Sequence, residues 1–334
     1  MDEMNSGASF LEYADCIITV SKEKIPGEGE DSFCYLLCET GGMIGAFDGC
    51  GGAGARHYEN CRNKTGAYLA SRAVSGAVFH WFEQNCNTNS TEMQTDALKK
   101  TIVESIKVCK DNSGQQKRTL IKGQMLKEFP TTAAVAVCSM LDGMLEVNCF
   151  WAGDSRCYIL QGDGLAQLTK DDVNSLDAFH NLSEDGTLQN LISASKEFDL
   201  HYAAFRISLP CVLIASTDGC FSYLPSPMAF EQLLIEKLLS VKKVSEFEEA
   251  LCEELDRCSG DDFTFLAIPV GYGTFEQFQE AFRSRLKDLR DQYLPEKDSG
   301  ISLEEKWNRY KNHYYQYMKS GVNDVDLPEM QGKE

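Results

Sequence analysis

The sequence predicts an α+β fold in which runs of strands are separated by pairs of helices. Its strand-like segments follow one another in groups, without the regular strand–helix alternation of a doubly wound sheet. The 334 residues have an ordinary apolar fraction and no internal repeat, and a chain of this length can bury a large core as one or two domains. Together these observations favour a layered α+β architecture.

The first half of the chain begins with strands and continues with two helices. Tyr35–Glu39 and Met43–Phe47 alternate around Gly41-Gly42, which predicts a hairpin. Residues 56–84 have the composition of a helix. Residues 95–109 carry apolar side chains three and four residues apart, which predicts a second helix.

The second half repeats this order of strands followed by helices. Residues 171–206 are polar and irregular, and we expect them to form a surface excursion. The predicted strands are 133–140, 145–152, 157–161, 211–216 and 263–270, and the predicted helices are 230–239 and 245–255.

After Gly271 the sequence pattern changes to amphipathic helices, which predicts a domain over 1–271 and a C-terminal helical extension over 272–334. Residues 275–293 form an amphipathic helix, and 295–300 interrupt it. A second helix carries an aromatic stripe of Trp307, Tyr310, Tyr314 and Tyr317. Either the stripe docks on the rest of the chain, or it is a surface for a protein partner, where Trp and Tyr are common anchors.

The charge balance excludes several kinds of protein. Thirty-two basic residues against 51 acidic ones give a net charge of -19, which disfavours nucleic-acid binding. The start of the sequence does not resemble a signal peptide, and no apolar run is long enough for a membrane span. We therefore expect a cytoplasmic protein with no membrane association, whose 14 cysteines are mostly buried thiols.

Acidic residues recur at the ends of predicted strands. The five sites are Glu30-Asp31, Asp48-Gly49, Asp154, Asp218-Gly219 and Asp261-Asp262. A single Asp-Gly pair is an ordinary turn. A set in which every such turn carries a carboxylate is less readily explained by turn formation alone.

If these strand ends converge, the carboxylates need a cation. Two carboxylates about 4 Å apart repel by roughly 4 kcal/mol at an effective dielectric of about 20. Oxygen ligands without His or Cys select Mg²⁺ or Mn²⁺. Two such ions can generate a hydroxide and hold a phosphoryl group, so the pattern predicts a binuclear site if the strand ends meet.

Seven motifs in order resemble the metal-dependent protein serine/threonine phosphatases (PPM, or protein phosphatase 2C, family), with features of bacterial members. The similarity spans roughly residues 13–271. The motifs are Glu30-Asp31-Ser32-Phe33, Phe47-Asp48-Gly49-Cys50-Gly51-Gly52, Pro130-Thr131-Thr132-Ala133, Gly153-Asp154-Ser155-Arg156, Leu168-Thr169-Lys170-Asp171, Ser216-Thr217-Asp218-Gly219 and Gly260-Asp261-Asp262-Phe263-Thr264.

The resemblance implies a four-layer αββα sandwich with the metal site at one edge and a flap near 171–206. It implies that Asp48 bridges two Mn²⁺ or Mg²⁺ ions, that the Gly49 carbonyl binds one, and that Asp218 and Asp261 ligate the other. Glu30 and Asp31 would hold metal-bound waters, and Asp154 would bind a third, weaker ion. Asp48, Asp218 and Asp261 are the expected catalytic residues.

Three positions depart from the family pattern. An arginine that grips the substrate phosphate is replaced here by a stretch in which only Lys22 or Lys24 could serve, and a lysine lacks the bidentate fork of arginine. Cys50 stands where many members have a histidine that protonates the leaving group, which makes Cys50 the candidate proton donor. Pro130 replaces a glycine.

The leading functional hypothesis is hydrolysis of phosphoserine and phosphothreonine in phosphoproteins by a hydroxide that bridges the two ions. The alternative is a regulatory binding module of the same fold with weak or no catalysis. The complete acidic set favours the enzyme, and the missing arginine favours the module. A two-metal nuclease is a weaker third reading, because the acidic motifs have no basic surroundings.

Overall fold

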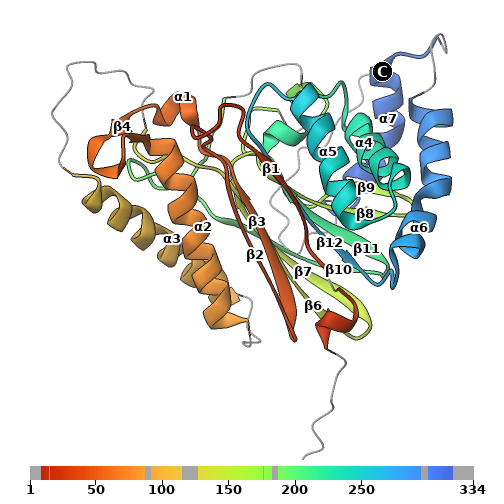
Figure 1. Ribbon diagram of the computed structural model, residues 1–334, viewed down its shortest axis with the longest axis horizontal. Coiled ribbons are helices and arrows are strands. Elements are labelled where there is room, and N and C mark those ends of the chain that lie inside the picture. The colour runs from red at the N-terminus through yellow and green to blue at the C-terminus, as the bar shows by residue number, and fades with distance from the viewer. Residues whose placement is uncertain are drawn as a thin grey trace, which may run out of the picture.

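The computed structural model describes residues 9–14, 16–86, 92–114, 127–175, 177–182, 187–294 and 300–318. Two antiparallel sheets of five strands lie face to face, with helices on both outer faces (Figure 1). The predicted α+β class is therefore confirmed, and the layer order is the αββα sandwich that the resemblance implied.

The first sheet has the strand order β10-β7-β6-β3-β2. Its strands are β2 (Ser32–Cys38), β3 (Gly41–Phe47), β6 (Ala133–Leu141), β7 (Met144–Ala152) and β10 (His201–Ile207). The second sheet has the order β1-β12-β11-β8-β9. Its strands are β1 (Ile18–Lys22), β8 (Arg156–Gln161), β9 (Gly164–Gln167), β11 (Cys211–Ser216) and β12 (Phe263–Val270).

Helices α2 (Gly66–Asn85) and α3 (Glu92–Asn112) cover the first sheet. The second sheet is covered by α4 (Pro227–Ser240), α5 (Val244–Cys258), α6 (Phe275–Asp288) and α7 (Leu303–Tyr314). The short elements are η1 (Phe10–Glu12), α1 (Gly51–Gly54), β4 (His57–Tyr58), η2 (Glu59–Cys61), β5 (Lys64–Thr65), η3 (His180–Leu182), η4 (Asp218–Cys220) and the π-helical turn η5 (Leu289–Tyr293).

Three hydrophobic cores hold the layers together. Strand β6 shows how the sequence builds two of them: Ala134, Ala136 and Cys138 face the inter-sheet core, whereas Ala133 and Val135 face the α2–α3 core. Because both faces of the strand are covered, its sequence is an unbroken apolar run. The third core, between the second sheet and the C-terminal helices, is called the α4–α7 core below.

Three predicted element boundaries were wrong. Ser32 to Cys38 pair with Phe47 to Gly41, so Glu39-Thr40 forms the hairpin turn and both glycines lie within β3. The first long helix begins at Gly66, where the Thr65 side chain caps its amino end, and residues 56–65 form short elements instead. The end of the predicted surface excursion is edge strand β10, which pairs with β7.

The C-terminal helices belong to the α4–α7 core. Phe282 of α6 and Trp307, Tyr310 and Tyr314 of α7 are at most 1% exposed. The aromatic stripe therefore docks on the chain itself, and these three residues do not form an exposed partner-binding face. The predicted break over 295–300 lies outside the described residues apart from Gly300.

None of the helices in the described ranges is both long and apolar enough to cross a lipid bilayer.

Candidate active site

The acidic residues singled out in the sequence meet at one edge of the two sheets. Ser32 pairs with Phe47, so the residues just outside these strands, Asp31 and Asp48, are neighbours. In the second sheet Ser216 pairs with both Arg156 and Phe265, which brings Asp218 beside the turns that carry Asp154 and Asp261. Asp48 interacts electrostatically with Asp31, Asp154, Asp218 and Asp261. The convergence that sequence could not show is therefore present.

Two glycines make this close approach sterically feasible. A Cβ on Gly49 would lie 2.7 Å from the carbonyl oxygens of both Glu30 and Ala67. A Cβ on Gly219 would lie 1.9 Å from the carbonyl oxygen of Asp262. Only glycine fits at such contacts, so each Asp-Gly pair is required by packing as well as by the turn.

Two threonines fix the backbone of Asp48. The Thr132 N–H donates to the Asp48 carbonyl at 2.8 Å, and the Thr131 hydroxyl donates to the same oxygen at 2.7 Å. The Thr132 hydroxyl also lies 2.6 Å from that of Ser155. Thr132 thus joins the end of β3 to the turn that carries Asp154, a role that the motif alone did not reveal.

A second set of polar contacts orients the first acidic pair. The Thr217 hydroxyl donates to Asp31 Oδ2 at 2.8 Å, and the Thr65 hydroxyl donates to Glu30 Oε1. Asp262 accepts backbone N–H groups of Lys24 and Glu30, each at 2.7 Å. Asp262 therefore holds the loop before β2, while its neighbour Asp261 stays exposed. Thr217 stands next to Asp218 in its motif, which was the signal in the sequence for its role, whereas Thr65 lies in none of the motifs.

The clustering raises the pKa values of the carboxyl groups. Burial, with the neighbouring charges of Asp218 and Asp262, raises the pKa of Asp31 to about 8. Burial, with the charges of Asp218 and Asp171, raises the pKa of Asp154 to about 8, and burial with Asp261 raises that of Asp218 to about 6. Burial and the surrounding aspartates raise the pKa of Asp48 well above its usual value. A cation would relieve this repulsion.

The residues present fit a hard divalent cation. Asp154 Oδ1 is buried and has no hydrogen-bond partner within the described part of the chain, so it is an unsatisfied acceptor at the cluster. In the same part of the chain, no three His, Cys, Asp or Glu side chains are already arranged around one ion. Mg²⁺ keeps several waters and takes only one or two carboxylates, so a closed cage is not required.

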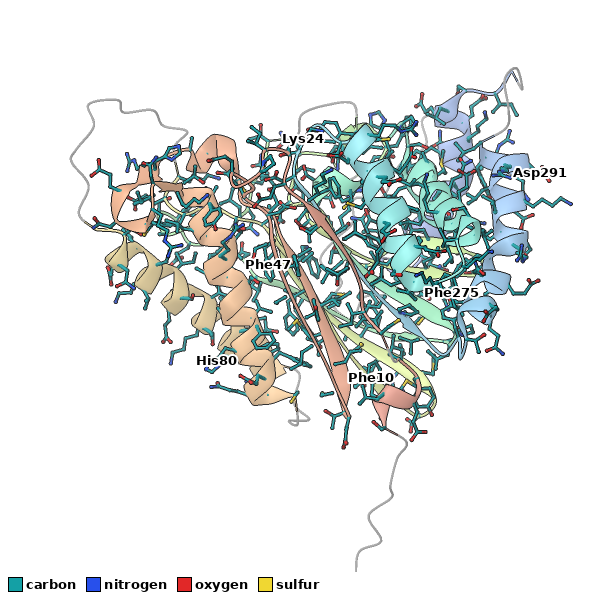
Figure 2. All side chains as sticks on the ribbon, in the orientation of Figure 1. Phe10, Lys24, Phe47, His80, Phe275 and Asp291 are labelled. Carbon is teal, nitrogen blue, oxygen red and sulfur yellow. The ribbon has the colours of Figure 1, made fainter. Side chains whose placement is uncertain are left out.

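The two lysines proposed as phosphate ligands have partners elsewhere. Lys22 Nζ lies 2.8 Å from Asp256 Oδ2, and Lys24 Nζ donates to the Ser259 carbonyl at 2.7 Å. Both contacts are at the carboxyl end of α5, and Lys24 lies at the upper edge of the molecule in Figure 2. Either side chain would have to leave its partner before it could reach a phosphate.

Cys50 and Lys127 lie on the α1 side of the cluster. Burial raises the pKa of Cys50 well above its usual value, the charges of Asp48, Asp154 and Asp218 raise it further, and the charge of Lys127 opposes them. The Lys127 N–H donates to the Ala53 carbonyl of α1 at 3.0 Å. Sequence reasoning missed Lys127, which has no motif of its own.

Arg156 is buried and interacts electrostatically with Asp154 and Asp218 of the cluster. It forms a bidentate ion pair with Asp171, with Nη2 2.6 Å from Oδ2 and Nε 2.9 Å from Oδ1. Its charge opposes the burial that raises the pKa of both Asp154 and Asp218. The next residue, Asp172, accepts the Gly153 N–H at 2.9 Å. The start of the predicted flap is thus bound to the Asp154 turn.

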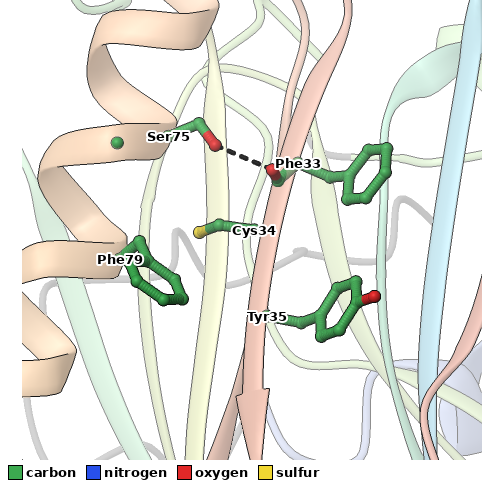
Figure 3. Close-up of a pocket in the computed structure, with 6 residues that line it drawn as sticks. Phe33, Cys34, Tyr35, Ser75 and Phe79 are labelled. Carbon is green, nitrogen blue, oxygen red and sulfur yellow. Dashed lines mark hydrogen bonds between the residues drawn. The ribbon is translucent and has the colours of Figure 1, made fainter.

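A surface hollow of about 310 Å³ lies away from these residues, between edge strand β2 and α2 (Figure 3). Phe33, Tyr35 and Phe79 line it, and the Ser75 hydroxyl donates to the Phe33 carbonyl at 2.8 Å across it. No predicted site residue lines this hollow, so it is not part of the candidate site.

Solved structures of bacterial phosphatases share the fold. The serine/threonine phosphatase PstP/Ppp of Mycobacterium tuberculosis matches with a TM-score of 0.54 at 15% identity, over 76% of this chain and 97% of that one. Stp1 of Staphylococcus aureus matches with a TM-score of 0.53 at 16% identity, over 77% and 96%. Another PstP structure, of the catalytic domain in complex with two manganese ions, matches with a TM-score of 0.50 at 16% identity, over 76% and 97%.

Sequence comparison gives the family directly. No curated protein matches the chain. The sequence profile described as "Protein phosphatase 2C", however, matches residues 44–256, which is more than half of the chain and includes Asp48, Asp154 and Asp218. The chain therefore belongs to the protein phosphatase 2C family.

Proposed function

We propose that this chain hydrolyses phosphoserine and phosphothreonine in proteins with the help of two Mn²⁺ or Mg²⁺ ions. The observation that carries the proposal is the convergence of Asp31, Asp48, Asp154, Asp218 and Asp261 at one sheet edge. Their mutual repulsion is unfavourable without bound cations. Family membership and the manganese-bound structural neighbour add support.

The proposed roles follow the family motifs. Asp48 would bridge both ions, the Gly49 carbonyl would bind one, and Asp218 and Asp261 would ligate the other. When bound, the ions would supply a hydroxide nucleophile and neutralise charge on the phosphoryl group. Glu30 and Asp31 would hold water through the orientations that Thr65 and Thr217 impose. Asp154 would bind a third ion.

Leaving-group protonation is the weakest part of the site. Cys50 follows the proposed ligand residues Asp48 and Gly49 in the chain, and its thiol is the proposed proton donor. Its raised pKa makes it a poor acid, however. An activated aryl ester needs no such donor, and we therefore propose it as the first substrate to assay.

The alternative function is a regulatory binding module with weak or no catalysis. The positions of Lys22 and Lys24 favour it. Both ammonium groups are bound at the end of α5, so neither serves as the cationic side chain that is expected to bind the substrate phosphate. The two functions differ in turnover. A module would bind Mn²⁺ and a phosphopeptide without releasing phosphate.

Metal dependence is the first test. The purified chain is expected to release phosphate from p-nitrophenyl phosphate and from a phosphothreonine peptide with Mn²⁺ or Mg²⁺, and EDTA should abolish the activity. The reason is the all-oxygen set of ligands. Full activity in EDTA, or a strict requirement for Zn²⁺, would contradict the proposal. Binding of Mn²⁺ without turnover would favour the module.

Phosphate binding is expected to depend on Lys127. Lys127→Met should weaken inhibition by inorganic phosphate about tenfold, because a hydrogen bond to a charged group contributes about 1.5 kcal/mol. Lys22→Met and Lys24→Met are the matched controls, and each should change the inhibition constant less than twofold. If Lys22→Met or Lys24→Met weakens phosphate inhibition more than Lys127→Met does, phosphate binding belongs to the lysines that the sequence suggested.

A further inference from the structure

The C-terminal helix α7 and its C-cap residue Tyr315, which is counted with α7 below, are bonded to the segment 177–182 in the first part of the predicted flap. Trp307 Nε1 donates to Asp177 Oδ1 at 2.8 Å, and the Ala178 N–H donates to the Tyr315 hydroxyl at 2.6 Å. The ring of Phe179 stacks on Trp307 with a centroid distance of 6.3 Å. Two hydrogen bonds and one aromatic contact therefore fix this segment to the C-terminal extension.

The same segment is bonded to the base of the candidate active site. Asn181 Nδ2 donates to Asp171 Oδ2 at 3.3 Å and to the Ser175 carbonyl at 3.1 Å. Asp171 holds Arg156, and Asp172 binds the backbone of Gly153 in both directions, at 2.9 and 3.0 Å. A continuous chain of contacts thus leads from α7 to the turn that carries Asp154.

A second route joins α7 to Arg156 through aromatic rings. Tyr314 packs edge-on against Tyr158 with a centroid distance of 6.3 Å, and Arg156 Nη1 donates to the Tyr158 hydroxyl at 3.2 Å. The guanidinium also lies 4.0 Å from the ring centroid of Phe221, just beyond η4. All of these side chains are buried, so a shift of α7 has no solvent layer to absorb it.

We propose that α7 is a positioning element of the metal centre: Trp307 and Tyr315 hold the segment 177–182, which fixes Asp171 and Arg156 and so sets Asp154 and Asp218 for cation binding. This inference rests on the proposed function for the identity of the site. It assigns to the C-terminal extension a role in metal affinity that lies outside the chemical step, and neither residue is itself a ligand.

The test removes the two polar links and keeps an aromatic ring at each position. In Trp307→Phe/Tyr315→Phe, the Mn²⁺ concentration for half-maximal activity and the calorimetric Mn²⁺ dissociation constant should rise about fivefold, within the range of coupling through packed networks. The turnover number at saturating Mn²⁺ should stay within twofold. In the metal-free protein, the Ala178 amide should exchange hydrogen faster. Asp171→Asn should weaken Mn²⁺ binding about 10- to 100-fold as a benchmark.

The matched control is Trp81→Phe/Tyr317→Phe. Trp81 is a buried tryptophan in the α2–α3 core whose N–H has no partner in the described part of the chain, and the Tyr317 hydroxyl donates to Gln161. The control deletes the same atoms but leaves segment 177–182 untouched, so its Mn²⁺ affinity should equal that of the wild type. The single variants Trp307→Phe and Tyr315→Phe decide the question if the double variant does not fold.

Unchanged Mn²⁺ affinity in folded α7 variants, or an equal loss in the control, overturns the inference. A lower turnover number at saturating Mn²⁺ with unchanged affinity also overturns it. If the wild-type chain binds Mn²⁺ but hydrolyses no phosphate ester, the proposed function fails while calorimetry and hydrogen exchange still decide the role of α7. If the wild-type chain binds no Mn²⁺, the inference fails as well.

Discussion

Asp48→Asn is expected to reduce turnover of p-nitrophenyl phosphate by about 1,000-fold or more, because it removes the charge proposed to hold both ions. The fold should persist, since the backbone of Asp48 is fixed by Thr131 and Thr132 and not by its carboxylate. Turnover over a range of Mn²⁺ concentrations measures the effect. Near-normal turnover would show that Asp48 is a turn residue and not a ligand.

The same substitution should stabilise the metal-free chain. The pKa of Asp48 is raised in the folded state, so its stability contribution is present below the unfolded pKa and is lost as the pH rises through the folded value. Asp31 and Asp154, with pKa values of about 8, act in the same direction. In EDTA, the melting temperature of the wild type should therefore decrease as the pH rises from 6 to 8.5. The melting temperature of Asp48→Asn should decrease less over the same range.

Asp142→Asn is the control for both measurements. Asp142 lies in the turn between β6 and β7 with a positive φ of 52°, which asparagine adopts as readily. It belongs to none of the acidic motifs, so its turnover should be that of the wild type and its melting temperature should show the same pH dependence. An equal change in both variants would mean that the effect comes from net charge alone.

Truncation after Gly300 is expected to prevent stable folding. It removes Trp307, Tyr310 and Tyr314, which are each about 1% exposed. Three buried aromatic side chains account for roughly 10–20 kcal/mol of transfer free energy as an upper bound, against a typical total stability of about 5–15 kcal/mol. Thermal unfolding and the soluble yield measure the loss.

Polar contacts add to this expected effect. The Tyr310 hydroxyl donates to Glu231, which forms a buried bidentate ion pair with Arg285 of α6. Removing α7 would expose this pair. The control is truncation after Met318, which keeps every described residue and should leave the melting temperature unchanged. If the chain truncated after Gly300 folds and keeps its Mn²⁺ affinity, α7 is dispensable.

The sequence was sufficient for the fold class, and it singled out the acidic residues that the fold brings together. Runs of strands with helix pairs predicted the layered α+β fold, because a strand covered on both faces, such as β6, must be apolar throughout. Predictions from local sequence failed where strand pairing determined the structure. Gly41 and Gly42 lie within β3 and not in a turn, and edge strand β10 lies in a segment that was predicted to be a surface excursion. Pairing with neighbouring strands outweighed local turn preference there.

The tertiary structure alone decided which of these residues lie together. Asp31, Asp48 and Asp218 are far apart in sequence, and only strand register makes them neighbours. In the folded chain, Lys22 and Lys24 bind the end of α5, and Lys127 lies close enough to Cys50 to interact with it electrostatically. The aromatic stripe of α7 is buried. The physical reason is that a motif specifies the chemistry of a side chain, whereas its partners depend on contacts between distant segments, which residue spacing does not encode.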